Sequence, residues 1–396
     1  MTPPARVQAA IELLDQIIAA ARDGGAAADV LIARYFKDRR YAGSKDRRAV
    51  RDLVYRVIRR SGERPQSGRA AMIGLAAEEP EVAALFTGQG HAPAPVGPEE
   101  QGSPSGALPQ WLIPHLYPEI NAVEQAAMLE RAPLDLRVNR LKAAPAAIAA
   151  MLPDAMPVAG LDQAFRLPPD SAIDQLPAYR EGLIEVQDAG SQWLAKACKA
   201  QPGMHVIDLC AGAGGKTLAL AADMDNRGRI LACDISRPRL QQLGPRAARA
   251  GASIIETRLI DPGREAQMLQ EQEGKADIVL IDAPCSGSGT WRRNPESRWR
   301  LTPARLARLV ETQAMLLELA RKLVAPGGKL VYAVCAITRD EGAGQMEAFV
   351  RRHSDWMADS SIGDARWPGR RVGAGRLLTP LHDGTDGFYF ARLQRS

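Results

Sequence analysis

Cysteine is scarce in this sequence, and its spacing excludes two common kinds of stabilised small domain. Only five of the 396 residues are cysteines, and no two of them form a CxxC pair: Cys198, Cys210, Cys233, Cys285 and Cys335. An odd number of cysteines without such pairs argues against a disulfide framework and against a four-ligand zinc site. We therefore expect free thiols and no bound metal.

Long apolar runs are also missing. No run approaches the roughly 18 apolar residues that a membrane-spanning helix needs. The first apolar stretch lacks the core of a signal peptide, because Glu12, Asp15 and Gln16 interrupt it. We expect a soluble, monomeric protein of the reducing cytoplasm with no membrane contact.

The composition is that of a globular protein with a substantial core, since 46% of the residues are hydrophobic and 24% are charged. The length allows two or three domains. A formal net charge of +5 is compatible with an anionic partner. A GC-rich genome explains the high Ala, Arg and Gly content equally well, so the bulk charge does not decide between the two explanations.

The N-terminal part is predicted to be helical and basic. Apolar residues at helical spacing predict helices over 5–23, 29–36 and 45–60, and the third carries arginines opposite its apolar stripe. Between Arg34 and Arg69 there are 13 Lys and Arg residues against 4 Asp and Glu, an excess of nine. A solvated helix face is one explanation, but so large a local excess favours nucleic-acid binding.

The middle of the chain changes character twice. Residues 88–109 are dense in Gly, Pro and Ser, which predicts a linker or an extended crossing segment. A helical stretch then runs from Trp111 through Glu130. The following residues have the pattern of a small α/β unit, with strands near 136–139, 164–167 and 182–186 and a helix over 145–152.

From residue 187 onward, strands and helices alternate. Strands are predicted at 205–209, 229–234, 253–261, 278–282, 329–335 and 387–393. One helix is predicted directly after Thr217, and another between the strand that ends at Asp234 and Ala250. Two more are predicted over 303–323 and 341–352. This alternation predicts a doubly wound sheet.

A glycine-rich turn after the first of these strands is the candidate cofactor loop. Its sequence, AGAGGKT, is neither GxGxxG nor a Walker A loop, because Cys210 stands where Walker A requires glycine. The next three strands end on Asp234, Asp261 and Asp282. Each acid alone is explained by helix capping. Together with the loop they indicate a pocket for a nucleoside without a polyphosphate, and S-adenosyl-L-methionine (SAM) fits that description.

Two cysteines follow the last two strands of the parallel series. Cys285 comes after the fourth strand and Cys335 ends the fifth, so adjacent parallel strands would bring both thiols to one rim of the sheet. A small buried hydrophobe is the alternative explanation for each cysteine taken singly. Beside a SAM pocket, however, a thiolate is the nucleophile that methylation of pyrimidine carbon 5 requires, because adding it to carbon 6 makes carbon 5 electron-rich.

Three motifs, DLCAGAGGKT, DAPCSGSGTWRRNP and YAVCAITRDE, resemble the RsmB/Sun family of RNA (cytosine-5)-methyltransferases. VQDAGSQ at 186–192 and DGFYFARL at 386–393 match further signatures of that family. The resemblance covers roughly residues 130–396, and the N-terminal helices look like a NusB-type RNA-binding domain. It implies a Rossmann-like SAM-dependent methyltransferase domain, preceded by a small α/β domain and an all-helical N-terminal domain. The expected boundaries are 1–87 (helical), 88–109 (linker), 110–185 (RRM-like) and 186–396 (catalytic).

The resemblance also implies roles for individual residues. Cys335 would be the nucleophile, Cys285 would assist release of the methylated base, and Asp282 would stabilise the cytosine ring near nitrogen 3. The methionine end of SAM would lie against Cys210, Ala211, Gly212, Ala213, Gly214, Gly215 and Lys216, the last of which is also near the chemistry. Asp234 would hold the ribose hydroxyls and Asp261 the adenine edge, with Asp282 closing the pocket. The RNA path would follow Arg292, Arg293 and Asn294.

The chain departs from the family pattern in four places, one of which is Gly342, beside Glu341, where the family usually has asparagine. Ala213 stands where the family often has proline, and Val334 and Ala336 replace hydroxyl residues around Cys335. The predicted activity is transfer of a methyl group from SAM to carbon 5 of a cytosine in structured RNA, with 16S ribosomal RNA favoured. Transfer RNA is the alternative substrate. A non-catalytic RNA-binding assembly factor is the alternative function, and the intact pair of cysteines argues against it.

Overall fold

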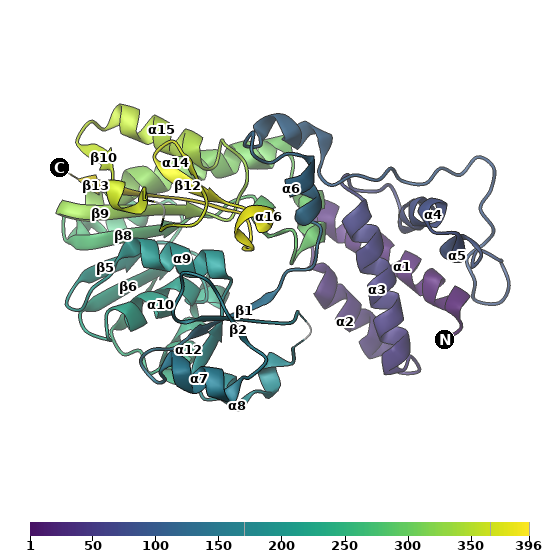
Figure 1. Ribbon diagram of the computed structural model, residues 1–396. Coiled ribbons are helices and arrows are strands. Elements are labelled where there is room, and N and C mark those ends of the chain that lie inside the picture. Colours follow the sequence, from purple (N-terminus) through teal and green to yellow (C-terminus); the bar gives the residue numbers. More distant parts are fainter. Residues whose placement is uncertain (170, 365, 396) are drawn as a thin grey trace. The chain divides into compact units, whose positions relative to one another are not determined.

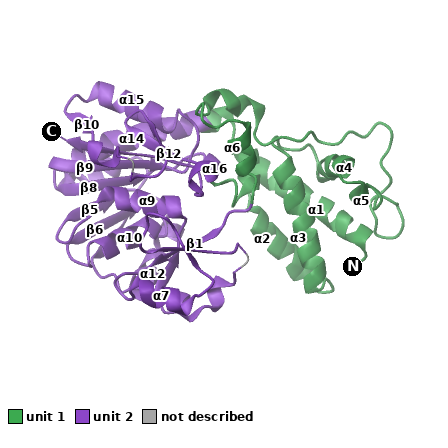
Figure 2. Cartoon of the chain, viewed as in Figure 1, with its two compact units in different colours: residues 1–130, 290–305 green, residues 131–289, 306–396 purple. Residues whose placement is uncertain are grey.

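The computed structural model describes residues 1–169, 171–364 and 366–395 (Figure 1). The chain forms two compact units (Figure 2). Unit 1 comprises Met1–Glu130 and Thr290–Arg305, and unit 2 comprises Arg131–Gly289 and the chain from Leu306 onward. Within the described ranges, none of the helices combines the length and apolarity that crossing a lipid bilayer requires.

Unit 1 is helical. Its helices are α1 (Pro3–Asp23), α2 (Ala28–Asp38), α3 (Ser44–Arg60), α4 (Gly68–Glu78), α5 (Pro80–Ala83) and α6 (Ala122–Ala127), with 3-10 turns η1 (Gln110–His115) and η5 (Pro295–Arg300). The Thr2 hydroxyl caps the start of α1, and Gly24 ends it in the left-handed conformation. The three predicted N-terminal helices are thereby confirmed. The stretch predicted from Trp111 through Glu130 is divided between η1 and α6, because Pro114 and Pro118 interrupt it.

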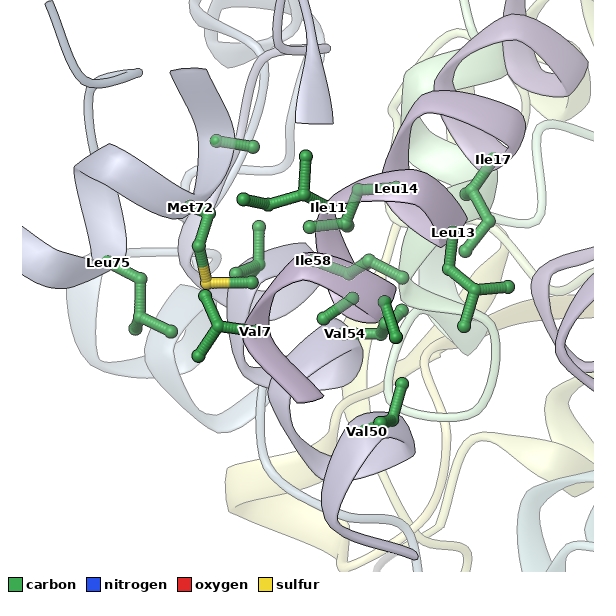
Figure 3. Packing of buried hydrophobic residues seen from close by; sticks show 14 of the residues in the cluster. Val7, Ile11, Leu13, Leu14, Ile17, Val50, Val54, Ile58, Met72 and Leu75 are labelled. Atoms are coloured by element: carbon green, nitrogen blue, oxygen red, sulfur yellow. The ribbon is translucent and has the colours of Figure 1, made fainter. Parts of the chain in front are cut away.

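The core of unit 1 forms where α1, α3 and α4 pack together. Figure 3 shows Val7, Ile11 and Leu14 of α1 facing Val54 and Ile58 of α3, with Met72 and Leu75 of α4 alongside. The sequence pattern did not predict α4, which has little apolar periodicity and contains two glycines. Gly74 is needed there, because a Cβ at that position would collide with the backbone of Ser103. The described residues between α5 and η1 form no helix or strand, and they are hydrogen-bonded to α3 and α4.

Residues 290–305 belong to unit 1 because Arg298 is buried there. Its guanidinium donates to the carbonyl oxygens of Ile58, Arg59 and Ala107, the last two at 2.8 Å. The indole of Trp299 donates to the carbonyl of Ser61 at 2.8 Å. Two backbone acceptors at the end of α3 and a third shortly before η1 are thus satisfied by a segment some 190 to 240 residues later in the chain.

Unit 2 contains two sheets. The smaller has the order β2-β3-β1-β4 and is antiparallel where its pairs are defined, with β1 (Leu134–Val138), β2 (Met156–Pro157), β3 (Ala164–Leu167) and β4 (Ile184–Val186). Helices α7 (Pro145–Met151) and α8 (Pro177–Arg180) accompany it. The small α/β pattern predicted over these residues is confirmed.

Among the described residues, the larger sheet has nine strands in the order β11-β12-β13-β9-β8-β5-β6-β7, with β10 paired to β13. Its parallel strands are β5 (His205–Asp208), β6 (Arg229–Asp234), β7 (Ile255–Leu259), β8 (Ala276–Asp282) and β9 (Val324–Val334). Its antiparallel strands are β10 (Trp356–Ala358), β11 (Arg370–Val372), β12 (Gly375–Leu378) and β13 (Phe388–Arg395). The strand order reverses between β5 and β8, which is where open α/β sheets bind ligands.

Helices connect these strands and confirm the predicted doubly wound fold. They are α9 (Ala189–Cys198), α10 (Gly215–Asp223), α11 (Arg237–Leu240), α12 (Leu243–Ala250), α13 (Glu265–Met268), α14 (Pro303–Leu323), α15 (Ala343–Arg352) and α16 (Pro380–Asp383). Helices α14 and α15 lie side by side (Figure 1), and the amide of Gln345 donates to the carbonyl of Val310 at 2.7 Å.

The two units divide the chain differently from the four predicted segments. Residues 110–130 belong to unit 1, and the small sheet belongs to the same unit as the large one. The carboxylate of Asp135 in β1 is one link between the small sheet and the rest of unit 2, because it accepts a hydrogen bond from the backbone of Ala189 at the start of α9, at 2.9 Å. Arg166 in β3 donates to the carbonyl of Gly384 after α16 at 2.7 Å.

Candidate active site

Two thiols meet at the carboxyl ends of β8 and β9. These strands are parallel neighbours, with Asp282 in register with Ala333, so the loops that follow them begin side by side. The sulfur atoms of Cys285 and Cys335 are 3.2 Å apart, within hydrogen-bonding distance, and both residues are partly exposed. The hydrogen bond to Cys335, together with burial, raises the pKa of Cys285 well above its ordinary value. Cys285 therefore holds its proton near neutral pH.

Backbone hydrogen bonds hold the two cysteine loops together. The amide of Ala283 donates to the carbonyl of Ala333 at 2.9 Å, and the amide of Gly289 donates to the carbonyl of Cys335 at 3.0 Å. The loop of Cys285 turns at Gly287, whose φ of 69° is in the left-handed region that glycine adopts without strain. The proximity of the thiols thus follows from a paired backbone.

Glu341 joins the same two loops through its carboxylate. It is fully buried, and it accepts hydrogen bonds from the amide of Ser286 at 2.7 Å and the hydroxyl of Ser286 at 2.6 Å. The hydroxyl of Thr338 donates to it at 2.6 Å and the amide of Gln313 at 3.2 Å. The sequence shows an acid six residues after Cys335, but only the fold reveals that its partner is the neighbour of Cys285.

An ion pair lies at the same rim. Lys216, in the first turn of α10, donates to Asp282 at the end of β8 at 2.7 Å. Burial lowers the pKa of Lys216, but the charge of Asp282 and its hydrogen bond, with a further contribution from Cys335, raise it overall. Lys216 is therefore a cation near the thiols, while about a third of the Asp282 side chain is exposed (32%).

Asp234 anchors the glycine-rich loop at the end of β6. One of its oxygens accepts from the amide of Gly212 at 2.7 Å, and the other accepts from the amide of Ser236 at 2.7 Å. Each carboxylate oxygen has a second lone pair, so these bonds leave acceptor capacity for a ribose hydroxyl. Ile235 beside it has a largely exposed side chain (60%), which is an apolar surface that sequence patterns did not single out.

Asp261 lies on the same rim but is less constrained. It follows β7 by two residues, and the amide of Ile260 donates to the carbonyl of Asp234 at 3.0 Å, which brings the two strand ends together. The Asp261 side chain is mostly exposed and lies 3.7 Å from the guanidinium of Arg264.

The glycine-rich loop has the features that a bound SAM needs. Apart from its chain neighbours and the backbone of its own helix, no described atom lies within 4 Å of the position that a Cβ on Gly215 would occupy, so the backbone there borders open space. Gly214 precedes α10, and in the described part of the chain no side chain caps that helix. The N–H groups at the start of a helix attract a carboxylate, and the methionine part of SAM carries one.

Asp208, at the end of β5, is a buried acid that sequence reasoning did not single out. The hydroxyl of Thr217 donates to one of its oxygens at 2.7 Å, while the other oxygen has no hydrogen-bond partner among the described residues. Burial raises the pKa of Asp208 to about 7. Its place as the last residue of β5, directly after Val206 and Ile207, was the available signal.

The three residues predicted along the RNA path belong to unit 1, whereas the thiols belong to unit 2. Arg292 is buried, Arg293 is partly exposed and Asn294 is exposed. Their predicted contact with RNA stays a prediction.

Comparison with known proteins matches this site to one family. Residues 195–394, which include both thiols and the glycine-rich loop, match the family model of the 16S rRNA methyltransferase RsmB/F. The chain belongs to this family. The match confirms the predicted kinship with RsmB proteins and the methyltransferase type of the large sheet.

Individual relatives agree with the RsmB/F assignment. The chain is 38% identical over 273 residues to the "Probable ribosomal RNA small subunit methyltransferase B" of Synechocystis sp., covering 66% of this chain and 60% of that protein. It is 34% identical over 295 residues to the ribosomal RNA small subunit methyltransferase B of Salmonella typhi, covering 72% and 66%. The chain therefore spans less than two thirds of the length of these relatives. A methyltransferase homolog protein from Pyrococcus horikoshii shares the fold, with a TM-score of 0.62, 25% identity and coverage of 71% and 92%.

Proposed function

We propose that this protein transfers a methyl group from SAM to carbon 5 of a cytosine in RNA through a covalent cysteine–cytosine adduct. The observation that carries the proposal is the pair of thiols 3.2 Å apart, Cys285 and Cys335, on the rim that also holds Lys216 and Asp282. RsmB/F kinship supports an RNA substrate, with 16S ribosomal RNA favoured.

In this proposal Cys335 is the nucleophile. Carbon 5 of cytosine is a poor nucleophile until a thiolate adds to carbon 6 and converts the ring to an enamine. The two sulfurs share one hydrogen bond, and we assign the attacking thiolate to Cys335 and the proton to Cys285, as the family resemblance implies. Once carbon 5 carries the methyl group, Cys285 passes its proton to the departing Cys335 sulfur across their 3.2 Å contact. The thiolate left on Cys285 takes the carbon 5 proton, so that the bond between Cys335 and carbon 6 breaks and the product is released.

Lys216 and Asp282 have supporting roles. The exposed part of Asp282 can hydrogen-bond the cytosine ring near nitrogen 3, and the cationic Lys216 keeps that carboxylate oriented. The target base must leave its stack to reach such a site, which favours a single-stranded or strained segment of RNA.

Residues 210–216, Asp234, Asp261 and Asp282 would hold SAM, which supplies an electrophilic methyl group when it is bound. Asp234 is suited to the ribose hydroxyls because its oxygens retain lone pairs, and the exposed Ile235 offers an apolar surface for the adenine. The mostly exposed Asp261 can accept a hydrogen bond from the adenine edge.

The other parts of the chain would bind the RNA. The α3 helix exposes Arg47, Arg48 and Arg51, so the N-terminal helices of residues 1–87 would act as a NusB-like RNA-binding domain. The small sheet would be the RRM-like domain, and Arg292, Arg293 and Asn294 would lie along the RNA path.

Bisulfite sequencing of total RNA from a strain lacking the gene tests the substrate. Loss of one methylcytosine from 16S ribosomal RNA is the expected result. Loss from transfer RNA would instead identify the alternative substrate. An unchanged pattern would indicate a non-catalytic assembly factor and contradict the proposal.

A further inference from the structure

Helix α12 contacts the glycine-rich loop at one end and the small sheet at the other. Its first residue, Leu243, packs so closely against Gly214 that a Cβ on that glycine would overlap the leucine side chain. At its last residue, Ala250, the carbonyl oxygen accepts a hydrogen bond from the side-chain amide of Asn139, just after β1, at 2.8 Å. The helix thus lies between the predicted cofactor loop and the small sheet, all within unit 2.

One side chain of α12 bridges the two directly. The guanidinium of Arg246 donates through Nη1 to the carbonyl oxygen of Ala213 at 2.7 Å. Through Nη2 it donates to Glu185 of β4 at 2.8 Å. Arg249, one turn further along, donates to the other oxygen of Glu185 at 2.5 Å, but within the described residues it makes no hydrogen bond to the loop. The two arginine side chains are equally accessible, at 25% and 26%.

Glu185 is a strong anchor for this bridge. Only 2% of it is exposed. Burial raises the pKa of Glu185, but the hydrogen bonds and charges of Arg246 and Arg249 outweigh burial and lower it overall. Glu185 is therefore ionised, and hydrogen bonds between ionised partners are stronger than neutral ones.

The carbonyl that Arg246 holds lies in an intrinsically flexible segment. Ala213 is flanked by Gly212 and Gly214, whose φ angles are 56° and 86°. Glycine loses more conformational entropy on ordering than any other residue, so a loop of this kind binds a ligand weakly unless it is held in place beforehand. The Arg246 bond supplies that restraint at the centre of the loop.

We propose that Glu185 and Arg246 are positioning residues for the cofactor. They hold the backbone of residues 212–215 in the conformation that binds SAM, so that the small sheet helps to set the affinity of the large sheet for its cofactor. The identity of the ligand rests on the function proposed above, whereas the bridge itself is a contact between residues of this chain.

The test is the dissociation constant for SAM, measured by isothermal titration calorimetry on the full chain. Arg246→Gln should raise the constant about tenfold, which corresponds to ~1.4 kcal/mol at 25 °C. Arg249→Gln is the matched control, because it removes an equally exposed partner of Glu185 without touching the loop, and it should leave the constant within about twofold. Glu185→Gln should weaken binding in the same direction as Arg246→Gln. In steady-state assays the Arg246 variant should change KM for SAM more than kcat, and leave KM for RNA unaltered.

Two results would overturn the inference: an unchanged SAM dissociation constant in Arg246→Gln, or an equal increase in both arginine variants. The second result would mean that α12 acts only through general stability. If the unaltered protein failed to bind SAM, the proposed function itself would be contradicted, and this inference with it.

Discussion

Replacing Glu341 should destabilise the region that holds the two thiols. In Glu341→Ala the amide and hydroxyl of Ser286 and the hydroxyl of Thr338 lose a buried acceptor that they now reach at 2.6 to 2.7 Å. A buried donor left without a partner costs about 1–3 kcal/mol. Because the two hydroxyls can rotate to other acceptors, we expect a total loss of about 3 kcal/mol in the free energy of unfolding. Glu341→Gln retains an acceptor oxygen and should lose less.

The assay for this prediction combines urea denaturation with hydrogen exchange. Peptides covering 282–289 and 332–342 report on the two cysteine loops directly, and both should exchange faster in Glu341→Ala. Glu347→Ala is the control, because Glu347 lies on the same segment but is exposed, with an ion pair to Arg339 at 3.1 Å. An exposed pair contributes about 0–1 kcal/mol. If Glu341→Ala resembled this control in both measurements, the view of Glu341 as the link between the loops would be refuted.

Three further perturbations have predicted outcomes. The folded pKa of Asp208, about 7, exceeds its unfolded value of 3.8, so its contribution to stability is fully present below pH 4 and is lost as the pH rises through 7. The free energy of unfolding of Asp208→Asn, measured by urea titration, should therefore rise relative to that of the unaltered protein between pH 5 and pH 8, by at most about 4 kcal/mol. A difference between the two proteins that did not change with pH would contradict this. Arg298→Leu leaves three carbonyls of unit 1 without their donor and should destabilise that unit by about 3–5 kcal/mol, measured by hydrogen exchange of α3; unchanged exchange would contradict the role of residues 290–305. Replacing Arg47, Arg48 and Arg51 with glutamine should weaken RNA binding and its dependence on salt. The slope of log K against log salt concentration should fall by about 0.7–0.9 for each phosphate that the variant no longer neutralises. An unaltered slope in filter-binding assays would show that this face of α3 does not bind RNA.

Apolar periodicity and the residues that start or end helices predicted most of the fold, because each of these signals lies within a single helix or strand. The helix Pro303–Leu323 was predicted with its observed bounds, since proline starts it and leucines recur along one side. The meeting of Cys285 and Cys335 followed from the expectation that they end adjacent parallel strands, which the pairing of β8 with β9 confirms. Such predictions need only periodicity and the order of strands.

Features that depend on distant partners could not be predicted. Residues 290–305 belong to unit 1 through the buried guanidinium of Arg298, and an arginine in a basic stretch gives no sign that it will be buried. The bridge from Glu185 through Arg246 to Ala213 joins three separate segments, and no spacing in the sequence marks it. Helix α4 lacks a marked apolar stripe, so its existence depends on packing against α1 and α3.

The central claim is the division of labour between the two thiols, and trapping of the covalent adduct tests it most directly. RNA and SAM are incubated with each cysteine variant, and the products are separated on a denaturing gel. With Cys285→Ala we expect a slowly migrating protein–RNA band, because attack occurs but release does not. With Cys335→Ala we expect no band and no turnover, while SAM still binds. A band with Cys335→Ala and none with Cys285→Ala would contradict the account, because it would show that Cys285 is the nucleophile.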